Sequence, residues 1–192
     1  MTEAGLEARL ETILRQSPTL MQVLETARDL ALPDWMIFSG AIYQRVLNHL
    51  TGRDLDYGIK DYDLGYHDAS DTSYEAEDLV IRRVAAAFEP PLRELVEVRN
   101  QARVHLWFEG KFGEAYAPLA STAEALSRFT TVAFSVGVRL EPGDRLTIAA
   151  PFGLEDLFAL RLSPNPSRQT RGFARTAASA TARWPELTVA QA

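Results

Sequence analysis

The chain has 192 residues, with 26 acidic residues against 20 Lys and Arg and a formal net charge of −6. This balance disfavours non-specific binding to nucleic acid through overall charge. The composition, 46% hydrophobic and 24% charged, is that of a globular protein and not of a disordered or fibrous one. The absence of cysteine excludes disulfides, thiolate zinc sites, iron–sulfur clusters and cysteine nucleophiles, and it fits a reducing compartment.

The length predicts one domain over residues 1–192. Within it, residues 1–33 read as an N-terminal helical segment and residues 163–192 as a poorly specified tail. The N-terminus lacks the basic and apolar regions of a signal peptide, and no apolar run reaches the roughly 18 residues that span a bilayer. We therefore expect a cytoplasmic protein that has no membrane partner.

Apolar residues spaced three and four apart predict helical structure over 6–32, interrupted at Ser17-Pro18. A short apolar run then ends at Ser39-Gly40, which marks the junction to a helix over 41–50. The polar, glycine-containing stretch 51–60 reads as a loop.

The alternating residues 61–66 predict a strand. Thr72 with Glu75 forms a capping-box pattern for a helix over 73–88, whose charged residues read as a solvated face. The other expected elements are strands at 92–98 and 102–108, a short helix opened by Ser121 and Glu124, a hairpin of 132–140 and 146–150, and a last helix within 153–162.

Helices and strands thus intermix without regular alternation. This order favours the α+β class, with a small mixed β-sheet flanked by helices, over a doubly wound parallel sheet.

Asp61 and Asp63 are the most informative residues. Side chains alternate along a strand, so both carboxylates point to the same face, where they repel each other unless a cation neutralises them. Hard oxygen ligands favour Mg²⁺ or Mn²⁺. By itself an Asp-x-Asp pair more often lies on a solvated strand edge.

Two further stretches strengthen the metal interpretation. Ser39-Gly40-Ala41 opens a helix, and a helix N-terminus with small residues offers free N–H groups to a phosphate. Glu97 lies between two valines on a strand that can neighbour the first. Three carboxylates on adjacent strands can hold two metal ions for an in-line displacement at phosphorus.

With these residues, the chain resembles the DNA polymerase beta-like nucleotidyltransferase superfamily, and more narrowly the bacterial "nucleotidyltransferase family protein" group, long catalogued as a domain of unknown function. The resemblance covers most of Trp35 to Asn165, and its most distinctive stretch is the run from Arg99 to His105. The other matching stretches are Ser39-Gly40-Ala41, 50–53, 57–63, 74–78 and 150–158.

The resemblance implies a nucleotidyltransferase fold, with Asp61 and Asp63 as a metal-binding pair and Glu97 as third ligand and base. Gly40 would let the triphosphate approach the backbone. The sequence departs from the family pattern at Ala41, where a serine is usual; Ser39 can partly substitute for the missing hydroxyl.

The implied reaction is transfer of a nucleoside monophosphate group from a nucleoside triphosphate to an acceptor, with loss of pyrophosphate. The acceptor is left open between a protein side chain, an RNA end and a small molecule. Arg99 and Asn100 are candidates for nucleotide binding because they follow Glu97, with a structural turn as the equally weighted alternative. Lys60, His105 and Asp156 read first as structural residues.

Two rival functions remain. The first is a catalytically inactive nucleotide-binding or regulatory module on the same fold, and the second is a zinc hydrolase, for which His49, His67 and His105 lack ligand spacing. The arginine-rich tail reads as a flexible solubilising segment, with contact to an anionic acceptor as the alternative. Its arginines are Arg161, Arg168, Arg171, Arg175 and Arg183.

Overall fold

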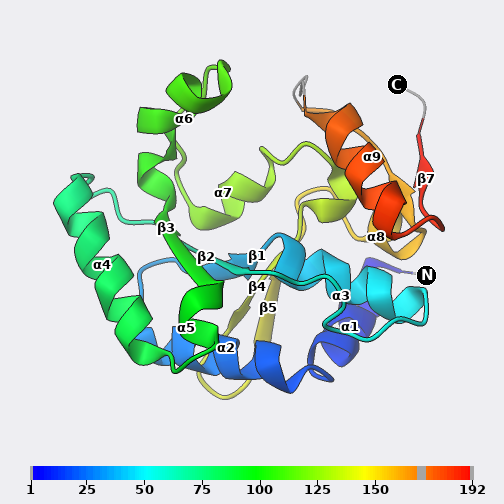
Figure 1. Cartoon of the computed structure of the whole chain (residues 1–192), viewed down its shortest axis with the longest axis horizontal. Coiled ribbons are helices and arrows are strands. Elements are labelled where there is room, and N and C mark those ends of the chain that lie inside the picture. The colour runs from blue at the N-terminus through cyan, green and yellow to red at the C-terminus, as the bar shows by residue number, and fades with distance from the viewer. Residues whose placement is uncertain (1, 168–171, 191–192) are drawn as a thin grey trace.

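The computed structural model describes residues 2–167 and 172–190 (Figure 1). Its N-terminal part forms two helices, α1 (Glu3–Leu14) and α2 (Pro18–Leu30). Ser17 accepts a 3.2 Å hydrogen bond from the Leu20 amide, and Pro18 occupies the first turn of α2, where its missing N–H is not needed. The predicted interruption at Ser17-Pro18 is therefore a helix boundary.

The described residues contain a five-stranded mixed sheet with the order β3-β2-β1-β4-β5. Strands β2 and β3 run parallel, and the other neighbouring pairs run antiparallel. The α+β class with a small mixed sheet is therefore confirmed. The strands are β1 (Met36–Phe38), β2 (Tyr62–Tyr66), β3 (Val96–Asn100), β4 (Gly137–Leu140) and β5 (Leu146–Ala149).

Helices and short turns surround this sheet, and a separate pair of two-residue strands forms near the C-terminus (Figure 1). None of the described helices is long and apolar enough to cross a membrane. The helices are α3 (Gly40–Leu50), α4 (Tyr74–Ala87), α5 (Leu92–Leu95), α6 (Val104–Phe112), α7 (Thr122–Leu126), α8 (Glu155–Phe158) and α9 (Phe173–Arg183). The 3₁₀ turns are η1 (Gln101–Arg103) and η2 (Val132–Phe134), and the extra strands are β6 (Arg161–Leu162) and β7 (Thr188–Val189).

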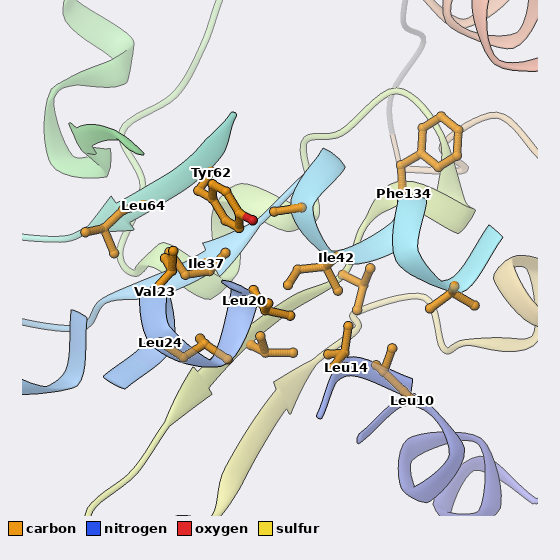
Figure 2. Packing of buried hydrophobic residues seen from close by; sticks show 14 of the residues in the cluster. Leu10, Leu14, Leu20, Val23, Leu24, Ile37, Ile42, Tyr62, Leu64 and Phe134 are labelled. Carbon is orange, nitrogen blue, oxygen red and sulfur yellow. The ribbon is translucent and has the colours of Figure 1, made fainter. Parts of the chain in front are cut away.

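The hydrophobic core lies between the two N-terminal helices, the sheet and α3 (Figure 2). Leu20 and Leu24 of α2 pack in one cluster with Ile37 of β1, Ile42 of α3 and Leu64 of β2. Fully burying such a side chain stabilises the fold by roughly 1.5–3 kcal/mol. This packing fixes the position of the β1–α3 junction relative to β2. The junction and β2 both contribute residues to the candidate site.

Before residue 110, the structure differs from several of the secondary-structure elements predicted from the sequence. Residues 102–108 do not form a strand: they form η1 and the start of α6, because the Asn100 side chain accepts the Ala102 amide and turns the chain. Helix α5 occupies the first part of the expected strand at 92–98. The N-cap of α4 is Ser73, which accepts from the Ala76 amide at 3.2 Å, so the Thr72–Glu75 capping box is wrong.

The C-terminal part is more ordered than the sequence suggested. The helix expected within 153–162 is limited to Glu155–Phe158, and the region predicted as a tail contains α9 and β7. Ala177, Ala180 and Trp184 are buried, so α9 has an apolar face that anchors it to the rest of the protein. Arg168 and Arg171 lie outside the described residues.

Candidate functional site

The three predicted carboxylates lie together at β2 and β3. Asp63 pairs with Glu97 across these parallel strands, so both side chains project from the same face. Asp61 immediately precedes β2, two residues before Asp63. The topology thus joins two residues that are 34 positions apart in the sequence.

The pKa of Asp63 responds to several neighbouring groups. Burial is the main reason that the pKa of Asp63 is raised to about 6, and the charges of Asp61 and Glu97 raise it further. A hydrogen bond with Ser39 and the charge of Arg99 act in the opposite direction. Five of the predicted site residues therefore share one electrostatic environment.

Ser39 reaches this environment because Phe38, at the end of β1, pairs with Asp63 of β2. The Ser39 backbone has φ 64° and ψ −143°, a conformation that residues other than glycine rarely adopt. Its side chain makes no capping bond to α3 and interacts with Asp63 instead. The first-turn amides of α3 thus have no side-chain cap, the arrangement in which a helix N-terminus can bind an anion.

Gly40 and Ala41 form the first turn of α3, as predicted. Ala41 is 0% exposed and packs in the core, so its side chain offers no hydroxyl group to a ligand. Gly40 is also buried, and a Cβ there would come 2.5 Å from the Gln44 amide nitrogen. Because Gly40 has no Cβ, the side chain of Gln44 can pack against the first turn of α3.

A cavity of about 640 Å³ opens beside Ser39. Its base includes Tyr43, whose ring stacks on Phe134 with centroids 3.8 Å apart. The remaining lining residues combine aromatic rings, charged groups and small residues from α6, the segment after α7, and α9. These are Phe108, Lys111, Phe112, Glu114, Arg128, Phe129, Thr130, Gly172, Arg175 and Thr176.

Tyr43 connects this cavity to the carboxylates. Burial raises the pKa of its hydroxyl, a hydrogen bond with Gln44 and the charge of Arg183 lower it, and the charges of Asp63 and Asp61 raise it slightly. The cavity adjoins the acidic residues at Ser39, which lines it and forms a hydrogen bond with Asp63.

Comparisons with known proteins agree with this geometry. The sequence profile of a family described as "Nucleotidyltransferase" matches residues 25–189. The chain belongs to this nucleotidyltransferase family. The matched range extends through α9, so the family pattern includes the helix that the sequence analysis assigned to a tail.

The fold also resembles a solved NMR structure described as a CCA-adding enzyme head domain, with a TM-score of 0.74 and 23% sequence identity. The match covers 100% of this chain and 97% of the other. A comparison with curated protein sequences found no match. The five-stranded sheet with flanking helices is therefore that of a nucleotidyltransferase head domain.

Nucleotidyltransferases typically use divalent metal ions, and carboxylate oxygens are ligands that suit Mg²⁺ or Mn²⁺. Within residues 2–167 and 172–190, no three Asp, Glu or His side chains lie close enough to form a finished metal centre. The carboxylates nevertheless repel one another around Asp63, which a cation would relieve. Glu97 is exposed, and exposed side chains change rotamer rapidly.

The side chain of Asn100 hydrogen-bonds within the turn after β3 and not with the carboxylates of the candidate site. It is 2% exposed; its Nδ2 donates to the Asp68 carbonyl at 2.8 Å, and its Oδ1 accepts from the amides of Asp68 and Ala102. The side chain is committed to the turn after β3, which was the structural alternative in the sequence analysis.

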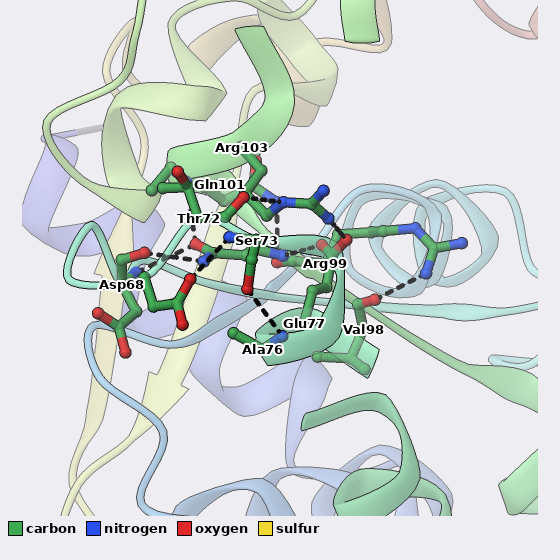
Figure 3. A network of polar contacts seen from close by, with 12 residues as sticks. Asp68, Thr72, Ser73, Ala76, Glu77, Val98, Arg99, Gln101 and Arg103 are labelled. Carbon is green, nitrogen blue, oxygen red and sulfur yellow. Dashed lines mark hydrogen bonds and ion pairs between the residues drawn. The ribbon is translucent and has the colours of Figure 1, made fainter. Parts of the chain in front are cut away.

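Glu77 supports the same turn (Figure 3). It is buried, accepts the Asn100 amide at 2.9 Å and forms an ion pair with Arg103. Its assignment to a solvated helix face is therefore wrong. The buried carboxylate is partnered, as a charge in the protein interior requires.

Sequence reasoning missed the aromatic and basic lining of the cavity. Phe108 was assigned to the strand expected at 102–108, and no element was predicted for Lys111 and Phe112. Arg175 and Arg183 were read as parts of a tail. Their separation by two helical turns, with Thr176 and Ser179 between them, was the signal that could have revealed a polar helix face.

Proposed function

We propose that the protein is a metal-dependent nucleotidyltransferase that moves a nucleoside monophosphate group from a nucleoside triphosphate to an acceptor and releases pyrophosphate. The observation that carries this proposal is the grouping of Ser39, Asp61, Asp63 and Glu97 beside the 640 Å³ cavity. Family membership supports a nucleoside triphosphate as the donor.

In this proposal Asp61, Asp63 and Glu97 hold Mg²⁺ or Mn²⁺, which when bound neutralises charge on the reacting phosphates. Ser39 and the start of α3 at Gly40 and Ala41 would lie beside the triphosphate. Arg99, which interacts electrostatically with Asp63, adds positive charge at the same place.

The nucleoside part of the donor would occupy the aromatic side of the cavity, where Phe108, Phe112 and Phe129 offer surfaces for stacking. Stacking tolerates different bases, so the lining by itself predicts little base selectivity. The acceptor stays open between a protein side chain, an RNA end and a small molecule.

In the reaction, an acceptor oxygen bonds to the α-phosphorus while the bond from this phosphorus to the bridging oxygen breaks. Pyrophosphate leaves with that electron pair, and the exposed carboxylate of Glu97 accepts the proton of an acceptor hydroxyl. Positioning and charge stabilisation supply most of the catalysis in reactions of this kind.

The first test is calorimetric titration of each of the four nucleoside triphosphates with Mg²⁺ or Mn²⁺, beside the double variant Asp61→Asn/Asp63→Asn. Circular dichroism would confirm that the variant is folded. We expect metal-dependent binding by the wild type and its loss in the variant. If the folded wild type bound none of the four, the enzyme proposal would be refuted.

The alternative is a catalytically inactive nucleotide-binding module. It is favoured by Ala41, which lacks a hydroxyl, and by the open arrangement of the carboxylates. Incubation of labelled nucleotide with cell extract separates the two: labelled product and pyrophosphate indicate an enzyme, and tight binding without either product indicates the module.

A further inference from the structure

Helix α9 presents one polar face toward the candidate site. Ser179 lies four positions after Arg175, three after Thr176 and four before Arg183, a spacing that brings these side chains to one side of a helix. All four line cavities, whereas Ala177 and Trp184 are buried on the side that packs against the protein.

Three cavities follow one another along this face. The 640 Å³ cavity shares Tyr43, Phe134, Arg175 and Thr176 with a second cavity of about 290 Å³. The second shares Ser179 and Arg183 with a third of about 420 Å³, which is also lined by Asp61. Together they form a trough, here called the α9 trough, that runs from Ser39 to Asp61.

Cations predominate among the described lining residues of the trough. Asp61 and Glu114 are its acidic members. The basic members are Lys60, Lys111, Arg128, Arg175 and Arg183. This excess contrasts with the net charge of −6 of the whole chain, so the basic groups are concentrated where a negatively charged ligand would lie.

Arg183 is held in place before any ligand arrives. Its Nη1 donates to the Gly58 carbonyl at 3.0 Å, and its guanidinium lies 4.5 Å from the centre of the Trp184 ring. A cation whose position is fixed in advance loses less entropy when it binds an anion. Ser179 and Thr176 add hydroxyl donors beside it.

We propose that α9 binds the β- and γ-phosphates of the donor nucleotide, through Arg175 and Arg183 with Thr176 and Ser179 as hydrogen-bond donors. This inference rests on the proposed function and extends it. It assigns to the C-terminal helix the recognition of a polyphosphate chain, while the carboxylates act at the α-phosphate. The number of phosphates then determines affinity more strongly than the identity of the base.

The test is calorimetric titration, with Mg²⁺ at low ionic strength, of ATP, ADP, AMP and inorganic tripolyphosphate. The proteins are the wild type, Arg175→Gln, Ser179→Ala and the control Arg82→Gln. Arg175 and Ser179 are exposed, so both variants are expected to fold, which a thermal melt would check. Arg82 is an exposed arginine of α4, on the opposite side of the molecule from α9 (Figure 1).

We expect Arg175→Gln to lower the affinity for ATP and for tripolyphosphate at least about tenfold, because a charged hydrogen bond to the phosphates is lost. The affinity for AMP should stay unchanged. Ser179→Ala should lower the affinity for the same two ligands by a smaller factor. Arg82→Gln should leave the affinity for all four ligands unchanged. The α9 assignment would be overturned if Arg175→Gln lost the same factor of affinity for ATP and for AMP, or if it kept the wild-type affinities. Either result would leave the proposed carboxylate site unaffected. If the wild type bound tripolyphosphate but no nucleotide, and Arg175→Gln lost this binding, α9 would remain an anion site while the proposed function would be refuted.

Discussion

Asp63 and Glu97 are direct partners across the parallel strands β2 and β3, and the Ser39 hydroxyl reaches Asp63 from the end of β1. Three neighbouring strands therefore each place one functional group at the same position of the sheet. Asp63 lies on the middle strand and is more buried than the exposed Glu97. Burial and the neighbouring negative charges therefore raise the pKa of Asp63.

The first prediction concerns the stability of the metal-free protein. The folded-state pKa of Asp63 is about 6 against a reference value of 3.8, so the folded state binds a proton more tightly than the unfolded state does. The free energy of unfolding should therefore fall as pH rises from about 4 to above 6, by roughly 3 kcal/mol in total.

Asp63→Asn should remove this dependence and be more stable than the wild type at pH 7.5. Urea unfolding of both proteins between pH 4 and pH 8 measures it. Parallel pH profiles for the two proteins would contradict the assignment.

A second prediction concerns divalent metal. Mg²⁺ at millimolar concentration should raise the melting temperature of the wild type at pH 7.5, because an ion that binds only the folded state stabilises it. The rise should shrink at pH 5, where Asp63 is protonated, and disappear in Asp63→Asn. Differential scanning fluorimetry with Na⁺ at matched ionic strength provides the control. If Mg²⁺ raised the melting temperature of Asp63→Asn as much as that of the wild type, the ion would bind at a site that does not include Asp63.

Ser39 allows backbone strain to be separated from the role of its hydroxyl. Ser39→Gly removes the hydroxyl and tolerates a φ of 64°, whereas Ser39→Ala removes the hydroxyl and keeps the strain. The glycine variant should be more stable than the alanine variant by about 1–3 kcal/mol.

Both Ser39 variants should show a higher pKa for Asp63, because the lost hydrogen bond favours the charged carboxylate. Chemical denaturation and carbon-13 titration of the Asp63 carboxyl would measure the two effects. Equal stabilities would show that the backbone here stores no strain.

Asn100 tests the structural role of the turn after β3. Asn100→Ala leaves the amides of Asp68 and Ala102 without their acceptor and should destabilise the protein by about 1–3 kcal/mol. Nucleotide affinity of the folded fraction should stay at the wild-type value. Asn100→Asp, which keeps the acceptor oxygen, should lose less stability. Loss of nucleotide binding without loss of stability would return Asn100 to the site.

The carboxylate pair could be predicted from sequence because a period of two is a local property of a strand. The start of α3 at Ser39-Gly40 was likewise visible, because a glycine after an apolar run is a strong local signal. These two features depend on residues close together in the sequence. The position of Glu97 beside Asp63 was only a hypothesis, because the two residues are 34 positions apart and the tertiary structure pairs their strands.

Sequence patterns could not reveal the partners of Asn100, Glu77 and Arg183, because each depends on contacts between distant segments. For Asn100, nucleotide binding and a structural turn were equally weighted, and the hydrogen bond to Asp68, 32 positions away, favours the turn. Arg183 looked like part of a tail until its guanidinium was found at Gly58, 125 positions away. The sequence by itself determined the acidic residues and the class of fold, since alternation and helix starts are local. Only the tertiary structure decided which basic and aromatic side chains surround them, because long-range packing brings α6 and α9 to the sheet.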